Sequence, residues 1–327
     1  MNHSATLAAV AALCAAGVAH AQNDGAALAN VPDYFPEVLL GPNTGEPALP
    51  TPPGPTGLEP GVGETQVNAG AAHLALGLDV TSAYFYRGLR LEDEGAIVQP
   101  YTTVGLDLVE KDEWSLQGYM GTWHSVHDVA TGATTQDSTL EHWYESDVYF
   151  GLTLTAGAWE FGAQYGWFLS PSDAFTTVEE LQFSAAYDDS EAMGDFALAP
   201  AVMVIFETGE GTSDGFGTGV YAQASIEPDV TLSEDDGLSM SFPMIVGVSL
   251  SDYYEHDDGS GGAGDDDFFG FASVGASLAW DLPVSDRYGA WSCHVSANAQ
   301  FLGDLAKEYN EDDGTVFVVT AGVSVEY

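Results

Sequence analysis

The chain has 327 residues, of which 50 are Asp or Glu and only 5 are Lys or Arg, so its formal net charge is −45. Binding to nucleic acid or to an anionic membrane surface requires a basic patch, and this composition argues against both as partners. Aromatic residues make up 12% of the chain and hydrophobic residues 45%, which excludes a disordered acidic protein. The carboxylates must therefore belong to a folded protein.

The first 21 residues have the pattern of a secretory signal. Residues 5–18 are apolar, and residues 19–21 (Ala-His-Ala) form a small-x-small cleavage site, so we expect export and removal of residues 1–21. Cys14 lies inside the apolar run after Leu13, which is too large for a lipoprotein signal. We therefore favour a cleaved signal peptide over a lipid anchor.

Residues 22–65 are rich in proline, glycine and alanine and show neither helical nor strand periodicity. This composition predicts a disordered linker that is partly polyproline-like. Cys293 is the only cysteine that remains after signal cleavage, so the mature chain has no intramolecular disulfide. Export without disulfides suits a β-protein of the cell envelope.

From residue 66 onward, apolar and polar residues alternate in runs that predict twelve strands. We place these strands at 73–87, 97–109, 114–125, 142–154, 159–169, 178–187, 195–207, 217–227, 239–251, 269–282, 289–302 and 315–327. The last run has one wholly apolar face, which includes Phe317 and Val319, and it ends on Tyr327. An even number of strands of about 10 residues with an apolar outer face is typical of bacterial barrels. We predict an all-β fold, a twelve-stranded antiparallel transmembrane (outer-membrane) β-barrel over residues 66–327.

Pro100, Pro200 and Pro243 fall inside these predicted strands. Proline cannot donate to a strand ladder, and a closed barrel has no edge strand on which to place it. We therefore expect a bulge or strand end at each of the three positions.

The predicted connections alternate in length. Shorter links are 110–113, 155–158, 188–194, 228–238 and 283–288, whereas the others are mostly longer, Gly- and Asp-rich loops at 88–96, 126–141, 170–177, 208–216, 252–268 and 303–314. Barrels with both termini in the periplasm have short inner turns and long outer loops. Interfacial aromatic residues are expected beside both kinds of connection, and the candidates are Trp114, Trp123, Trp143, Trp159, Trp167, Trp280, Trp291 and Tyr327.

The segment 78–89 (LDVTSAYFYRGL), followed by 94–100 (EGAIVQP), resembles the first hairpin of Gcw_chp, a proteobacterial barrel family of unknown function. That hairpin has the form T-S-D-Y-x-F-R-G and then P-A-x-Q-G, and the third strand of the family resembles residues 119–125. Ala83 stands where the family has Asp, and Gly95 and Pro100 exchange its Pro and Gly. The resemblance covers the first three strands and implies an outer-membrane location, with no substrate and no catalytic residues.

A cluster of charged residues follows the first predicted strand. Two of the five basic residues lie here beside three acids, and the cluster comprises Arg87, Arg90, Glu92, Asp93 and Glu94. One interpretation is a local salt-bridge cluster that pins the first loop. The alternative is a gate or ligand site, because perturbed charges mark functional sites.

Polar residues on the predicted inner face suggest a pore. The inward candidates are Asp79, Asp107, Glu145, Asp147, Glu160, Gln164, Glu180, Gln182, Glu207, Glu227, His294 and Asn298, with Glu326 near the chain end. An acidic lumen attracts cations and repels anions, whereas a lumen filled by side chains makes a structural barrel. We predict a small cation-preferring pore or a structural envelope protein, without enzymatic activity or a cofactor.

Two alternatives stay open. His294, Ser296 and Asn298 share one predicted face and resemble the His, Ser and Asn that outer-membrane phospholipases carry, which suggests a hydrolase. Same-face neighbours on one strand are about 7 Å apart, and this exceeds the reach of a His–Ser hydrogen bond. The second alternative is a soluble periplasmic β-sandwich.

The acidic loops are candidates for weak Ca²⁺ binding, because Ca²⁺ takes flexible oxygen ligands. The candidate ligands are Asp257, Asp258, Asp265, Asp266 and Asp267. Solvated acidic loops are the alternative interpretation of such runs. The expected partners are outer-membrane lipid and lipopolysaccharide, together with the barrel-assembly machinery during insertion.

Overall fold

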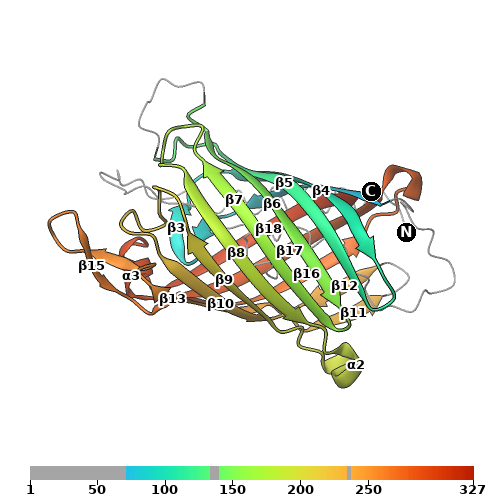
Figure 1. Ribbon diagram of the computed structural model, residues 1–327. Helices are drawn as coiled ribbons and strands as arrows, with labels where there is room; N and C mark the ends of the chain where they lie inside the picture. The colour runs from blue at the N-terminus through green and yellow to red at the C-terminus, as the bar shows by residue number, and fades with distance from the viewer. Residues whose placement is uncertain (1–70, 133–139, 234–236) are drawn as a thin grey trace.

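Twelve antiparallel strands close into a barrel in the computed structural model, which describes residues 71–132, 140–233 and 237–327 (Figure 1). The wall consists of β1 (Ala72–Thr81), β4 (Ile97–Glu110), β5 (Trp114–His127), β6 (Trp143–Ala156), β7 (Trp159–Leu169), β8 (Val178–Tyr187), β9 (Ala201–Glu207), β10 (Val220–Ile226), β13 (Met244–Ser251), β16 (Phe269–Asp281), β17 (Ala290–Leu302) and β18 (Thr315–Glu326). The expected signal peptide (1–21) and linker (22–65) lie outside the described residues.

Pairing between the first and last strands closes the barrel. β1 pairs with β18 from Ala75↔Glu326 to Thr81↔Thr320, and β18 pairs in turn with β17. Every wall strand therefore has two neighbours, so no wall strand is left as an edge. This closure answers the sandwich alternative, because a sandwich would consist of two separate open sheets.

The outer surface of the barrel is apolar. Large side chains exposed on it include Leu76, Met120, Phe150, Phe183, Val202, Val246, Val274, Phe301 and Phe317. The residues between them on each strand face inward, because side chains alternate along a strand. A closed barrel with an apolar exterior and a polar interior is the architecture of a transmembrane β-barrel. Among the described helices, none has the length and apolarity that a membrane crossing requires.

The two ends of the barrel differ. The turn end carries the links 111–113 and 157–158, the short helices α2 (Ser190–Met193), η1 (Gly194–Phe196) and η2 (Asp286–Tyr288), and the hairpin of β11 (Asp229–Ser233) and β12 (Leu238–Ser241). The loop end carries the hairpin of β14 (Glu255–Asp257) and β15 (Ala263–Asp266), together with α3 (Asp304–Glu308) (Figure 1). The expected link 228–238 is therefore largely this β11–β12 hairpin, which explains its unusual length.

The structure corrects the first predicted strand, 73–87. β1 ends at Thr81, and Tyr84–Tyr86 forms a separate strand, β2, which pairs with β3 (Leu89–Glu92) in a sheet of its own. The sequence alternates through both segments, so periodicity could not separate them. The β2–β3 hairpin lies inside the barrel toward the loop end (Figure 1).

Two of the three prolines lie at strand ends. Pro200 precedes β9, and Pro243 occupies the gap between β12 and β13. The expectation of a strand end therefore holds at Pro200 and Pro243: the predicted strand 195–207 begins only at Ala201, and 239–251 is divided in two. It is wrong at Pro100, which lies within the continuous strand β4, pairs with Leu78 of β1 and causes no register shift toward β5.

Glycines inside the wall make room for tyrosines on the next strand. Tyr149 is the cross-strand partner of Gly121, and Tyr119 is the partner of Gly151. A methyl group at Gly121 would come within 2.2 Å of Tyr149 Oη and 2.6 Å of the Thr102 carbonyl oxygen. The ring of Tyr149 therefore lies over the bare backbone, as in the aromatic rescue of glycine.

We expect Gly121→Ala to destabilise the barrel by about 1–3 kcal/mol, because the backbone oxygen of Thr102 cannot move aside as a side chain would. Unfolding by urea in lipid vesicles measures the effect. Gly105→Ala is the matched control, since its methyl group would meet only the flexible end of Gln117 at 3.3 Å. Equal stability of the two variants would contradict this account of the glycine.

Seven of the eight aromatic residues expected at the membrane interfaces lie on the outer surface. Trp114, Trp143, Trp159 and Tyr327 are exposed, and Trp167, Trp280 and Trp291 are half-buried at outward positions. Trp123 is the exception, because it has no exposed surface and faces the interior. Trp123 and the buried Ser125 are two residues apart on β5, so they lie on the same face of the strand. Alternation along the strand therefore places Trp123 on the inner face.

Candidate functional site

The inward residues expected from the sequence fall into two groups. Those near the middle and the loop end are buried, namely Asp79, Glu145, Asp147, Gln164, Glu180, Gln182, Glu207 and Asn298. Those toward the turn end are more open: Glu160, Glu227 and His294 are half-buried, and Asp107 and Glu326 are exposed. The lumen is therefore filled toward the loop end and wider toward the turn end.

The β2–β3 hairpin forms the plug of the barrel, defined here as residues 82–92. Its tight turn has positive φ at Arg87 (46°) and Gly88 (88°), as a type I′ hairpin turn requires. A non-glycine residue pays for this conformation in steric strain, which persists only where the surroundings hold it. The turn brings the Arg87 side chain to the wall.

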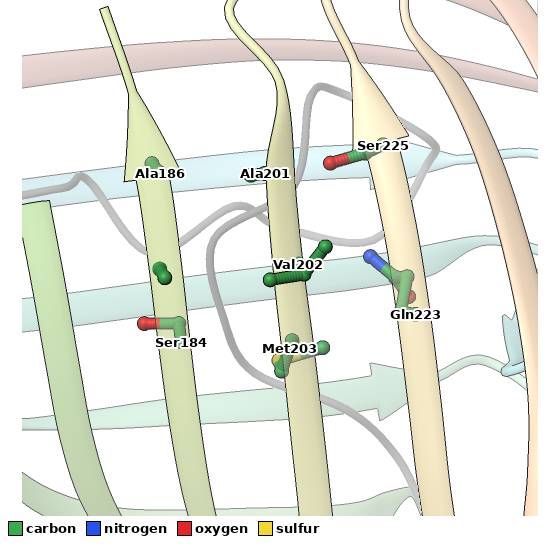
Figure 2. Close-up of a pocket in the computed structure, with 8 residues that line it drawn as sticks. Ser184, Ala186, Ala201, Val202, Met203, Gln223 and Ser225 are labelled. Atoms are coloured by element: carbon green, nitrogen blue, oxygen red, sulfur yellow. The ribbon is translucent and has the colours of Figure 1, made fainter. Parts of the chain in front are cut away.

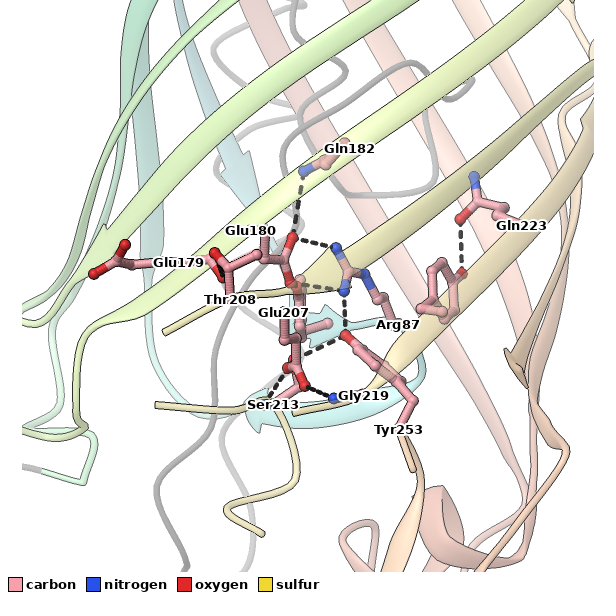
Figure 3. Close-up of polar contacts among 12 residues, drawn as sticks. Arg87, Glu179, Glu180, Gln182, Glu207, Thr208, Ser213, Gly219, Gln223 and Tyr253 are labelled. Carbon is pink, nitrogen blue, oxygen red and sulfur yellow. Dashed lines mark hydrogen bonds and ion pairs between the residues drawn. The ribbon is translucent and has the colours of Figure 1, made fainter. Parts of the chain in front are cut away.

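Arg87 is fully buried and forms a two-pronged ion pair with Glu180 of β8. Its Nη1 and Nη2 donate to Glu180 Oε1 and Oε2 at 2.9 and 2.8 Å. Nη1 also donates to the hydroxyl of Tyr253, and the Arg87 carbonyl accepts from Tyr254 Oη at 2.8 Å. The guanidinium lies 4.5, 4.7 and 5.2 Å from the ring centroids of Tyr86, Tyr221 and Tyr253. Charge and cation–π contacts both hold the plug at this point (Figure 3).

Glu207 extends this network to the loops. Its carboxylate accepts from the amide and hydroxyl of Ser213, both at 2.6 Å, and from the Gly219 amide at 2.7 Å. Tyr253 Oη donates to Ser213 Oγ at 2.8 Å. Figure 3 shows the resulting chain of contacts from Glu207 through Ser213 and Tyr253 to Arg87 and Glu180. Loop 208–219, loop 252–268 and the plug are therefore joined inside the barrel.

The charged cluster expected at residues 87–94 is divided in the structure. Arg90 pairs with Asp93 at 3.1 Å and with Glu311 at 3.3 Å on the surface, which agrees with a loop-pinning role. Glu92 instead accepts from the amides of Asp93 and Glu94. Arg87 does not belong to this cluster, because its partner lies 93 residues further along the chain.

Aromatic side chains pack around the plug on two sides. One cluster contains Phe85, Leu89, Tyr221, Tyr253 and Tyr254 with Leu305 of α3. The other contains Tyr84, Tyr86, Trp123, Tyr149 and Phe168. Tyr84 lies 5.4 Å from Trp123 between ring centroids, and its hydroxyl donates to Glu145 Oε2 at 3.2 Å. Trp123 therefore supports the plug from the wall.

The proposed nucleophilic trio does not come together. His294, Ser296 and Asn298 all face the lumen from β17, but His294 Nε2 lies beside Asp79 Oδ1, at 3.5 Å. Gly322 of β18 is the cross-strand partner of Asp79 on β1 and of His294 on β17. A methyl group at Gly322 would come within 1.9 Å of the Asp79 carboxylate. The geometry thus favours an Asp–His pair over a His–Ser dyad.

A small hollow lies among β8, β9 and β10. It has a volume of about 20 Å³ and is lined by Ser184, Ala185, Ala186, Ala201, Val202, Met203, Gln223 and Ser225 (Figure 2). That volume suffices for about one water molecule. Short side chains on these three strands leave the space, which is far too small for an organic substrate.

Most of the acidic loop residues proposed as Ca²⁺ ligands bond to their own loops. Asp257 and Asp258 accept from the amides of Gly259 and Ser260, both at 2.7 Å, and Asp266 accepts from three backbone amides and Ser249 Oγ. Asp267 pairs with His256 at 2.9 Å. In the described part of the chain, no group of three or more His, Cys, Asp or Glu side chains is arranged to hold a metal ion. Loop Ca²⁺ stays a prediction that titration would test.

Two titratable groups, His256 and Asp214, should make the stability of the loops at the loop end depend on pH. Partial burial lowers the pKa of His256, but hydrogen bonds and charges from Asp267 and Glu308 outweigh it and raise the pKa overall. Burial raises the pKa of Asp214 to about 7, although its hydrogen bonds to the amides of Phe216 and Glu255 act in the opposite direction. Raised pKa values mean that the folded loops hold these protons more tightly than the unfolded chain.

We therefore expect the loops to be more stable at pH 5 than at pH 8. The contribution of Asp214 is lost between about pH 4 and about pH 7, and that of His256 is lost as the pH rises through its raised pKa. Amide hydrogen exchange of residues 252–268, corrected for intrinsic rates, measures the effect. His256→Gln should reduce the pH dependence, and equal protection at both pH values would contradict the expectation.

No family model matches the chain, and no curated protein matches it. Solved structures with a similar outline are the COG4313 outer membrane channel from Pseudomonas putida F1 (TM-score 0.46, 12% identity, covering 83% of this chain and 100% of that one), the NanC porin (0.39, 10%, 77% and 98%) and outer membrane phospholipase A from Escherichia coli (0.37, 12%, 77% and 89%). Similarity at this level carries no information on activity.

Proposed function

We propose that the protein is a channel of the bacterial outer membrane that prefers cations and is closed here by the plug. The observation that carries this proposal is the distribution of buried charge. Glu145, Asp147, Glu180 and Glu207 belong to the wall, whereas Arg87, the only Lys or Arg among the buried residues that the structure describes, belongs to the plug. When the plug moves aside, the remaining lumen is anionic and attracts cations.

The same features support an outer-membrane location. The apolar outer surface would contact outer-membrane lipid, with the loop end at the cell surface and the turn end in the periplasm. The barrel-assembly machinery would insert the chain, and the acidic loops would meet lipopolysaccharide through bridging divalent cations. The resemblance of residues 78–100 to Gcw_chp implies the same membrane.

Planar-bilayer recording of the mature protein in a salt gradient tests the channel. We expect a reversal potential of the sign that cation selectivity produces, and we expect Glu180→Gln to reduce it. Asp258→Asn, in an exposed loop, serves as the control and should leave selectivity unchanged. Anion selectivity would contradict the proposal.

A structural envelope barrel is the second candidate, and it is favoured by the complete burial of side chains such as Tyr86, Glu145 and Glu180. The two candidates differ in one result. A structural barrel would conduct neither as the wild type nor with its plug released by Arg87→Ala. We favour the channel, because a purely structural core could be filled with apolar groups at lower electrostatic cost.

A further inference from the structure

The lumen contains a built site for a guanidinium group, and the plug's own arginine occupies it. Glu180 receives both Nη atoms of Arg87, at 2.9 and 2.8 Å, in the fork geometry that distinguishes guanidinium from other cations. The rings of Tyr221 and Tyr253 lie 4.7 and 5.2 Å from the guanidinium carbon. These three groups belong to the wall and to loop 252–268, so they do not leave with the plug.

A second anionic position lies beside the first on the wall. Glu145 and Asp147 face the lumen from β6 with no exposed surface. The two carboxyl groups lie within hydrogen-bond reach of each other. No other hydrogen-bond donor among the described residues reaches the carboxyl oxygens of Asp147 or Oε1 of Glu145. Trp123 and Phe168 are the cross-strand neighbours of Asp147. Two adjacent buried carboxyl groups with no donor outside the pair, flanked by two aromatic rings, complement a cation that carries N–H groups.

We infer that the solutes of this barrel are small organic cations that bear a guanidinium or primary ammonium group. This inference rests on the proposed channel function and names its substrate class. Arg87 acts as a tethered occupant of the first position in the closed state, and the position formed by Glu145 and Asp147 receives the N–H donors of the solute. A quaternary ammonium ion matches the charge but offers no donor.

Calorimetric titration of the detergent-solubilised mature protein tests the inference, with methylguanidinium, ethylammonium and tetramethylammonium as probes. Arg87→Ala vacates the first position, and we expect it to bind methylguanidinium at least tenfold more tightly than tetramethylammonium. Adding Glu180→Gln should remove most of that affinity. In the Arg87→Ala background, where the plug is released, ethylammonium should also bind at the second position, and adding Asp147→Asn should weaken it at least tenfold.

Two results would overturn the inference: equal affinity for tetramethylammonium, or no binding of any N–H probe to the folded wild type and the folded Arg87→Ala variant. Heat-modifiable migration on a gel confirms that each variant is folded. If Arg87→Ala does not fold, Arg87→Lys, which keeps the charge but not the two-pronged pair, takes its place in the same titrations. Cation conductance without probe binding would contradict this inference but not the proposed channel function. Probe binding without conductance would contradict the channel function but not the presence of the binding site.

Discussion

Arg87→Ala is expected to destabilise the closed barrel by about 3–5 kcal/mol, because removing one partner leaves a buried charge without compensation. Glu180 would then have no guanidinium, and Tyr253 would lose the donor that joins it to the plug. The strained turn at residue 87 would also lose the contacts that hold it. Urea unfolding in lipid vesicles measures the stability, and planar-bilayer recording measures the opening.

The open probability of the channel should increase as the stability of the closed barrel decreases. A bias of about 1.4 kcal/mol toward the open state multiplies its population tenfold, so we expect at least a tenfold increase in open probability. Arg87→Lys keeps the charge but cannot form the two-pronged pair, and it should fall between the wild type and Arg87→Ala. An unchanged closed state in Arg87→Ala would show that the ion pair does not hold the plug.

Arg90→Ala is the matched control for this experiment. Arg90 is also an arginine of the plug, but its pairs with Asp93 and Glu311 lie at the surface. Exposed pairs contribute about 0–1 kcal/mol, so both stability and conductance should stay near the wild-type values. A large effect of Arg90→Ala would show that the surface cluster, and not the Arg87–Glu180 pair, holds the plug.

Glu207→Ala is expected to cost about 3–5 kcal/mol, because two buried amides and a hydroxyl each lose their acceptor, at roughly 1–3 kcal/mol for each group. The amides of Ser213 and Gly219 would lose their acceptor in a buried setting, and Ser213 would no longer be held against Tyr253. We expect loop 208–219 to lose hydrogen-exchange protection and the plug to open more often. Exchange mass spectrometry and bilayer recording measure the two effects.

Glu210→Ala controls for a change in loop charge, since Glu210 is exposed in the same loop. It should leave exchange in the loop unchanged. Glu207→Gln should have an intermediate cost, because its NH₂ group would face one of the donors that the carboxylate accepts. Normal hydrogen-exchange protection of loop 208–219 in Glu207→Ala would show that Glu207 does not couple the loop to the plug.

Local alternation determined most of the wall. Because side chains alternate along a strand, the sequence alone predicted twelve strands and placed Glu145, Asp147 and Glu180 on the inner face, where the structure has them. The same rule misassigned residues 84–87, since alternation continues through the break after Thr81. The expected interfacial role of Trp123 was also wrong, although its parity with Ser125 on β5 was a signal that could have placed it inside.

The plug was beyond the reach of sequence, because its contacts join positions far apart in the chain. Arg87 and Glu180 are 93 residues apart, and Arg87 and Tyr253 are 166 apart. Nothing local in either segment names the other as its partner. The amino-acid order determined a polar, acid-rich inner wall by itself. Only closure of the barrel decided which carboxylate holds the single buried arginine of the described chain and which have no cation beside them. Closure sets which inward residues face one another across the lumen.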